Sequence, residues 1–191
     1  MTMRRLILSS LLVVGIASTT AVADDASASF VTRLFINVCV PNVGQPENVR
    51  AWALEKKLTE VTALSALEVF VGAGDGGAAW AVPTSFGSFA LSIRGKTHAC
   101  AAWARAADPA EVEGNFRKLL EGAARPGVVV KVVADANAPG PTVIHTLIYA
   151  VSNAGNDRRG YLYTLQTAEK TGGAFQATLQ AAKYENAPQP H

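Results

Sequence analysis

The chain has 191 residues, of which 49% are hydrophobic and 17% are charged, and its formal net charge is +2. This length and composition predict one globular domain with an ordinary hydrophobic core. A chain this close to neutral lacks the positive surface with which proteins bind nucleic acids or anionic lipid. We therefore exclude nucleic-acid binding, and no apolar stretch after residue 23 is long enough to span a membrane.

The first 23 residues have the pattern of a cleavable secretory signal peptide. Arg4 and Arg5 precede an apolar run over residues 6–17, and an Ala-Val-Ala sequence at residues 21–23 provides a cleavage site. The apolar run is shorter than the roughly 20 residues that span a bilayer. We expect cleavage after Ala23 and a periplasmic or secreted protein, whereas an uncleaved membrane anchor is the alternative.

Two cysteines, Cys39 and Cys100, lie beyond this segment. An even number of cysteines in an exported chain favours a disulfide bond, and two separate buried thiols are the alternative. A bond between them closes a loop of about 60 residues, for which chain entropy predicts roughly 4 kcal/mol of stabilisation. Two cysteines without a clustered pair of histidines do not complete a zinc site, so we expect neither a metal nor another cofactor.

Beyond the expected cleavage site, the sequence divides into a lead-in, one domain and a tail. Residues 24–29 are small and polar, which predicts a flexible lead-in. Residues 30–184 are expected to form the single domain, and residues 185–191, with two prolines, a disordered tail. The segment 30–40 is predicted to be a helix or an extended stretch that brings Cys39 to the core.

Three further segments have helical patterns. Pro46 suits the first turn of a helix that directs Trp52 into the core, and a second short helix is expected over residues 64–71. The third helix has Asp108 as its N-cap and Pro109 in its first turn, and it ends at Gly122.

Most of the remaining sequence reads as short strands separated by turn residues, which indicates antiparallel neighbours. The predicted fold is α+β: an antiparallel sheet of about six or seven strands with two or three helices packed on one face. Trp52, Trp80, Trp103 and Phe116 are expected between the helices and the sheet. The strands are predicted at residues 78–82, 88–94, 97–104, 128–135, 142–152, 160–168 and 173–184.

Two motifs resemble sites of chemistry but favour structural roles. The glycine-rich segment 72–77 follows a helix and precedes a strand, the reverse of the order in phosphate-binding loops, so a tight connection is expected. His98 and Cys100 share a predicted strand face, as a catalytic base and nucleophile would, but a bridged Cys100 has no thiolate.

A binding patch is predicted on the C-terminal strands. His145 and Tyr149 share one strand face, and Tyr161 and Tyr163 share a face of the next strand, so the four side chains are expected on one surface. If no helix covers that surface, it is the best candidate for binding. Packing within the core is the alternative for each of the four residues. Arg158 and Arg159, at a hairpin tip, are expected to serve solubility.

Five short segments carry a resemblance to a known family. They are residues 35–40 (Phe-Ile-Asn-Val-Cys-Val), 46–52 (Pro-Glu-Asn-Val-Arg-Ala-Trp), 77–83, 87–91 and 100–104. In these segments the chain resembles a family of small, uncharacterised exported proteins and lipoproteins of proteobacteria. The resemblance covers roughly residues 30–125 and implies an envelope protein with two paired cysteines and no established activity. The chain departs from the lipoprotein members because it lacks their acceptor cysteine.

For function, the sequence favours an exported, non-catalytic binding or accessory module, because no recognised catalytic motif is present. Its partner would be an envelope protein or a small molecule, and its oligomeric state cannot be read from the residues. One alternative is a hydrolase-type enzyme with a site assembled from Asp75, Arg94 and His98. Another is an inhibitor or accessory subunit of a secreted enzyme.

Overall fold

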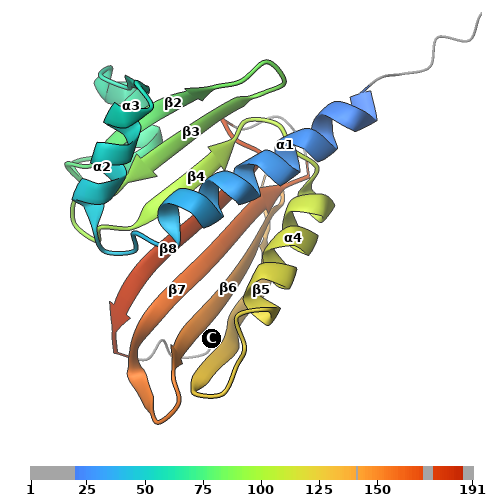
Figure 1. Cartoon of the computed structure of the whole chain (residues 1–191). Coiled ribbons are helices and arrows are strands. Elements are labelled where there is room, and N and C mark those ends of the chain that lie inside the picture. The colour runs from blue at the N-terminus through green and yellow to red at the C-terminus, as the bar shows by residue number, and fades with distance from the viewer. Residues whose placement is uncertain (1–19, 141, 170–173, 187–191) are drawn as a thin grey trace, which may run out of the picture.

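The structure is a computed structural model that describes residues 20–140, 142–169 and 174–186 (Figure 1). In this part of the chain, eight strands form one antiparallel sheet, surrounded by four α-helices and one π-helical turn. The α+β class is therefore confirmed, whereas the expected numbers of strands and helices were too low. Residues 1–19, which hold most of the expected signal peptide, lie outside the described residues.

The helical elements are α1 (Thr20–Leu34), the π-helical turn η1 (Phe35–Cys39), α2 (Pro46–Glu55), α3 (Leu64–Val71) and α4 (Pro109–Glu121). The strands are β1 (Thr59–Glu60), β2 (Ala78–Pro83), β3 (Ser88–Ile93), β4 (Cys100–Ala104), β5 (Val128–Ala138), β6 (Ile144–Asn153), β7 (Asn156–Ala168) and β8 (Ala177–Glu185).

The order of the strands across the sheet is β1-β2-β3-β4-β8-β7-β6-β5. The first four strands and the last four each form a run of antiparallel neighbours, and the two runs meet where β8 pairs with β4. Helix α4 connects β4, in the middle of the sheet, with β5 at the far edge (Figure 1). This connection carries α4 across one face of β5 to β8.

Helix α1 and turn η1 form the central element of the main core. Val31, Phe35 and Val38 are fully buried, and they lie on one side of the helix, as its period of 3.6 residues requires. Residues 24–29, expected to be a flexible lead-in, are instead helical, and Ser27 and Ala28 are buried. The small residues that suggested a linker thus belong to a helix, and Ala28 is part of the main core.

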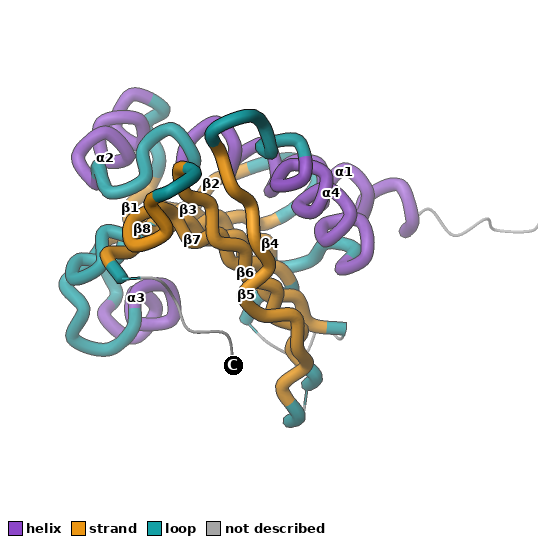
Figure 2. The backbone as a smooth tube through the Cα atoms, turned by 90° about the horizontal axis from the view of Figure 1, so that it is seen from below, coloured by secondary structure: helices purple, strands orange, loops and turns teal. Residues whose placement is uncertain are grey.

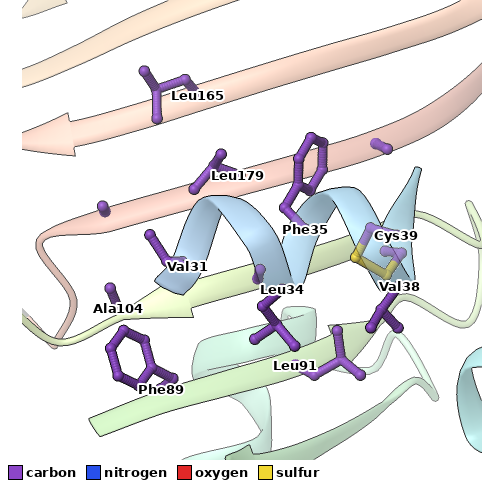
Figure 3. Packing of buried hydrophobic residues seen from close by; sticks show 14 of the residues in the cluster. Val31, Leu34, Phe35, Val38, Cys39, Phe89, Leu91, Ala104, Leu165 and Leu179 are labelled. Atoms are coloured by element: carbon purple, nitrogen blue, oxygen red, sulfur yellow. A yellow bond between two sulfur atoms is a disulfide. The ribbon is translucent and has the colours of Figure 1, made fainter. Parts of the chain in front are cut away.

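The main core lies between these helices and the sheet. Figure 3 shows Val31 and Phe35 directed toward the strands that carry Leu165 and Leu179. Phe116 of α4 and Trp80 of β2 belong to the same core, as expected, and Trp52 of α2 is half-buried against it.

A disulfide bond joins Cys39 and Cys100, with a distance of 5.2 Å between the two Cα atoms. It ties the end of η1 to the first residue of β4, and both cysteines are buried in the main core. The prediction of a disulfide is therefore confirmed, and the alternative of two separate thiols is wrong.

The N-terminus of α4 has the predicted cap. The carboxylate of Asp108 accepts a hydrogen bond from the backbone N–H of Glu111 at 2.8 Å, and Pro109 occupies the first turn. Val112, Phe116 and Leu120 form the buried face of the helix.

A second, smaller core lies on the opposite face of the sheet. There, Phe70 of α3 packs against Trp103 of β4 and Phe175, with ring centroids 5.0 to 5.5 Å apart. Figure 2 shows α3 on one side of the sheet and α1 and α4 on the other. The expectation that all helices pack on one face was therefore wrong, and so was the placement of Trp103 in the main core.

The remaining differences concern element ends. Strand β1 has two residues, too few to give an alternating pattern, and was not predicted. Glycines 72, 74 and 76 have positive φ angles in the tight connection from α3 to β2, as expected. Glu185 belongs to β8 rather than to a tail, and residues 187–191 lie outside the described part. Among the described helices, none combines the length and the hydropathy that crossing a membrane requires.

Candidate functional site

All four residues of the predicted patch lie on the sheet face that carries α1 and α4. Tyr149 and Tyr163 are direct partners across β6 and β7, and Tyr161 lies two residues before Tyr163. His145 lies four residues before Tyr149, so strand alternation places it on the same face. The four side chains therefore run along one face of neighbouring strands.

Helix α4 covers the middle of this row. The ring of Phe116 lies 5.9 Å from that of Tyr149, and only 5% of Tyr149 is exposed. The predicted patch is thus not one open surface. Tyr161 and Tyr163 line a groove beyond the C-terminal end of α4, whereas His145 belongs to a polar cluster along its side.

The groove has a cavity volume of about 570 Å³. Its floor comes from the ends of β6, β7 and β8, and its walls include Ala123 and Arg125 from the connection between α4 and β5. A volume of this size falls within the range of roughly 300–1,000 Å³ that is typical of small-molecule sites.

The two tyrosines give the groove an aromatic wall. Their ring centroids are 6.4 Å apart, and 40% of Tyr161 is exposed. Tyr163 is half-buried, with its ring 6.2 Å from Phe35, and burial followed by the neighbouring Tyr161 raises the pKa of its hydroxyl. That hydroxyl makes no hydrogen bond to another described residue. It therefore stays protonated at neutral pH and is available as a donor to a ligand.

Three cationic side chains, Arg125, Arg159 and Lys183, line the same groove, with one carboxylate, Glu185. This arrangement was not expected from the sequence, where Arg159 was predicted to serve solubility. Strand spacing offered a pattern that could have found part of it, because Arg159, Tyr161 and Tyr163 alternate on one face of β7. The approach of β8 beside β7, which adds Lys183, depends on the tertiary fold.

The polar cluster consists of Glu113, Arg117, Asp135 and His145. The two ring nitrogens of His145 each face a carboxylate: Nδ1 lies 3.1 Å from Glu113 and Nε2 lies 2.7 Å from Asp135. Arg117 donates to the same two carboxylates, at 2.8 and 2.9 Å. The cluster thus joins α4 to β5 and β6.

A bulge in β5 places Asp135 in the cluster. The pairing of β5 with β6 shifts by one residue between Val132 and Ala134. Without this shift, Asp135 would point to the opposite face, because side chains alternate along a strand. The shift therefore puts Asp135 on the same face as His145 and beneath Arg117.

Within this cluster, electrostatics favour the charged forms of Asp135 and Arg117. Hydrogen bonds from Arg117 and then from His145 lower the pKa of Asp135 below its ordinary value. Asp135 and then Glu113 raise the pKa of Arg117 above its ordinary value. Both nitrogens of His145 are engaged with carboxylates, so neither is directed at a hydroxyl or thiol that it could activate. The cluster is built to hold α4 on the sheet.

The residues of the alternative hydrolase site lie near one another but are used in a turn. The carboxylate of Asp75 accepts a hydrogen bond from the backbone N–H of Gly95, in the hairpin between β3 and β4. His98 is exposed in the same hairpin, and its backbone N–H donates to the carbonyl of Arg94. Within the described residues, no hydrogen bond joins the His98 ring to an acid.

Metal binding finds no support in the described part of the chain, which contains no group of three or more histidine, cysteine or acidic residues arranged to hold an ion. No family model matches the sequence, and neither a curated protein nor a solved structure matches it. The resemblance to exported proteobacterial proteins therefore stays a prediction.

Proposed function

We propose that this protein is an exported, non-catalytic binding module that holds a small molecule in the groove at the ends of β6, β7 and β8. The observation that carries the proposal is the cavity of about 570 Å³ with Tyr161 and Tyr163 on its wall. Tyrosines are suited to such a role because their rings give apolar contact while their hydroxyls stay in water.

The surroundings of the groove support binding rather than catalysis. Its floor is made of paired strands, so the lining side chains are held by a rigid scaffold. The His145 ring lies in the polar cluster along α4 and is not among the residues that line the groove. Both cysteines are joined in the disulfide bond, so neither offers a nucleophilic thiolate.

Export is the second part of the proposal, and it rests on the pattern in residues 1–23 and on the disulfide bond. Disulfide bonds form and persist in oxidising compartments such as the bacterial periplasm. The near-neutral charge of a chain that begins at Asp24 agrees with a small-molecule ligand better than with a nucleic acid.

One preparation tests both parts. The full-length chain is expressed in a Gram-negative bacterial host and recovered from the periplasm, where its mass should correspond to residues 24–191. The recovered protein is then screened by two-dimensional amide NMR against a library of neutral, anionic and cationic fragments. Hits that shift the resonances of Tyr161, Tyr163 and their neighbours support the proposal. An intact chain in the cytoplasm overturns the export, and a library without hits in the groove overturns the binding site.

A further inference from the structure

The charges around the groove are unbalanced. Arg125, Arg159 and Lys183 line it, and Glu185 is the only carboxylate among the lining residues that the structure describes. Within the described chain, no salt bridge involves any of these four side chains, although Arg159 and Glu185 are register partners on β7 and β8. The three cations are therefore available to a ligand.

This imbalance is local. The chain as a whole is close to neutral, with 17 basic and 15 acidic side chains. In the polar cluster, by contrast, Arg117 pairs with both Glu113 and Asp135. Three cations and one carboxylate therefore lie together in the groove of a chain whose basic and acidic side chains are nearly equal in number.

The position of Lys183 follows from the backbone of the turn that precedes α2. Gly44 in that turn has a φ angle of +72°, and the Lys183 side chain lies directly against it. A β-carbon at Gly44 would lie 2.6 Å from Lys183 Cδ and 2.8 Å from its Nζ, so the lysine side chain would have to move. The absence of a side chain at Gly44 therefore leaves room for the Lys183 side chain, which also lines the groove.

The aromatic wall lies next to the cations. Lys183 is the direct partner of Tyr161 across β8 and β7, and Arg159 is two residues from Tyr161 on the same strand face. A ligand that placed a ring against Tyr161 would thus have one cation on the neighbouring strand and another along the same strand. Arginine forms paired hydrogen bonds with carboxylates and phosphates, and lysine adds a point charge.

We infer that the ligand of the groove is a small organic anion: a carboxylate or phosphate group attached to a ring that packs on Tyr161 and Tyr163. This inference rests on the proposed binding function and names its ligand class. The anionic group lies between Arg159 and Lys183, with Arg125 on the opposite wall. The Tyr163 hydroxyl donates a hydrogen bond to a polar atom of the ring.

Four probes test the ring and the anionic group of the inferred ligand separately. Phenyl phosphate has both the ring and the anion, phenol has only the ring, inorganic phosphate has only the anion, and benzylamine carries the opposite charge. Amide NMR titrations of the recovered protein should give the tightest binding for phenyl phosphate, weakening as salt screens the charges. Vesicles that contain phosphatidylglycerol form a separate arm, which distinguishes a phosphate presented by a lipid from a soluble one.

Charge variants locate the anion. Lys183→Gln and Arg159→Gln should each weaken the binding of phenyl phosphate by about threefold to tenfold and leave phenol unchanged. Arg158→Gln is the matched control, because Arg158 is equally exposed but does not line the groove. The thermal unfolding of each variant shows that it is folded.

The outcomes separate this inference from the proposed function. If phenol or benzylamine binds in the groove as tightly as phenyl phosphate, the ligand class is wrong while the groove remains a binding site. Equal losses in Arg158→Gln and Lys183→Gln would also overturn the inference, because the attraction would then be general. If neither the probes nor the fragment library shift groove resonances, both proposals fail together.

Discussion

At the scale of single residues, the position of one carboxylate depends on one extra residue in a strand. The shift in register after Val132 turns Asp135 toward Arg117 and His145. Such a shift is not visible in the residue pattern of β5, which is rich in valine on both faces. For that reason His145 was a candidate from the sequence, but the other three members of the polar cluster were not.

The Glu113 to Arg117 spacing was a cue that could have been used. Two opposite charges four residues apart on a helix are neighbours on one face. The sequence shows that pair, but only the structure shows that the face meets the edge of the sheet. The same limit applies to the tyrosines. Their strand face was predicted correctly, but the cover of Tyr149 by α4 depends on where the connection from β4 to β5 crosses the sheet.

The lowered pKa of Asp135 leads to a prediction about acid stability. A carboxyl group with a lower pKa in the folded state stabilises the protein above its unfolded pKa of about 3.9. That stabilisation is lost as the pH falls through the lower, folded pKa. Asp135→Asn should therefore reduce the unfolding temperature at pH 6, and the difference from the unmodified protein should shrink toward pH 3.

Thermal unfolding followed by circular dichroism from pH 3 to pH 7 measures this difference. Asp157→Asn serves as the control, because Asp157 is exposed and its carboxylate makes no salt bridge within the described residues. If the unfolding temperature of Asp135→Asn differs from that of the unmodified protein by the same amount from pH 3 to pH 7, the carboxylate acts through packing and not through its charge.

At the scale of elements, the sequence predicted local structure well and its placement less well. Helix α4 begins where Asp108 and Pro109 indicated, since both act on the backbone within one turn. Helix α3 has the predicted bounds, but it lies on the opposite face from α1. Its apolar residues do not reveal which face of the sheet they cover, because both faces of β2 to β4 carry small or apolar side chains.

The disulfide bond connects η1 with β4, and its contribution to stability can be measured. Replacing both Cys39 and Cys100 by alanine should lower the free energy of unfolding by about 4 kcal/mol, because the unfolded chain regains the freedom of a loop of about 60 residues. Urea unfolding with and without a reducing agent gives the value.

The reducing agent also provides the internal control for this measurement. It should lower the free energy of unfolding of the unmodified protein by about as much as the double substitution does. It should leave the free energy of unfolding of the double variant unchanged. Equal urea midpoints for the oxidised and reduced forms of the unmodified protein would contradict the prediction.

At the scale of the whole molecule, one hydrophobic core spans both halves of the sheet. Phe35 is the residue that shows this most clearly, because its ring lies 6.3 Å from Phe116 and 6.2 Å from Tyr163, while its neighbour Cys39 is bonded to β4. The single domain was predicted from length and composition. The pairing of β8 with β4, which makes the sheet continuous, joins residues far apart in sequence and has no local pattern.

A continuous core predicts one cooperative unfolding transition. The composition offers separate probes, since the three tryptophans lie at residues 52, 80 and 103 and the four tyrosines at residues 149, 161, 163 and 184. Tryptophan fluorescence therefore reports on the first half of the sheet and tyrosine absorbance on the second. The two signals should change at the same denaturant concentration.

Phe35→Ala should lower the free energy of unfolding by about 3–5 kcal/mol, because it removes a fully buried ring shared by both halves. The tryptophan and tyrosine transitions should therefore shift together to lower denaturant concentration. Asn37→Ala, at an exposed position two residues away, should move neither. Separate midpoints for tryptophan and tyrosine, in any of the three proteins, would show two independent folding units.

The insertion of β8 between β4 and β7 also sets the order in which the protein can assemble. Until residues 177–185 have left the ribosome or the translocation channel, β4 has an unpaired edge, and such an edge attracts other extended chains. The segment that closes it follows β5, β6 and β7 in the chain, so the sheet cannot be completed until all of these strands have been made. A chain that crosses a membrane unfolded and folds only after release would meet this requirement without delay.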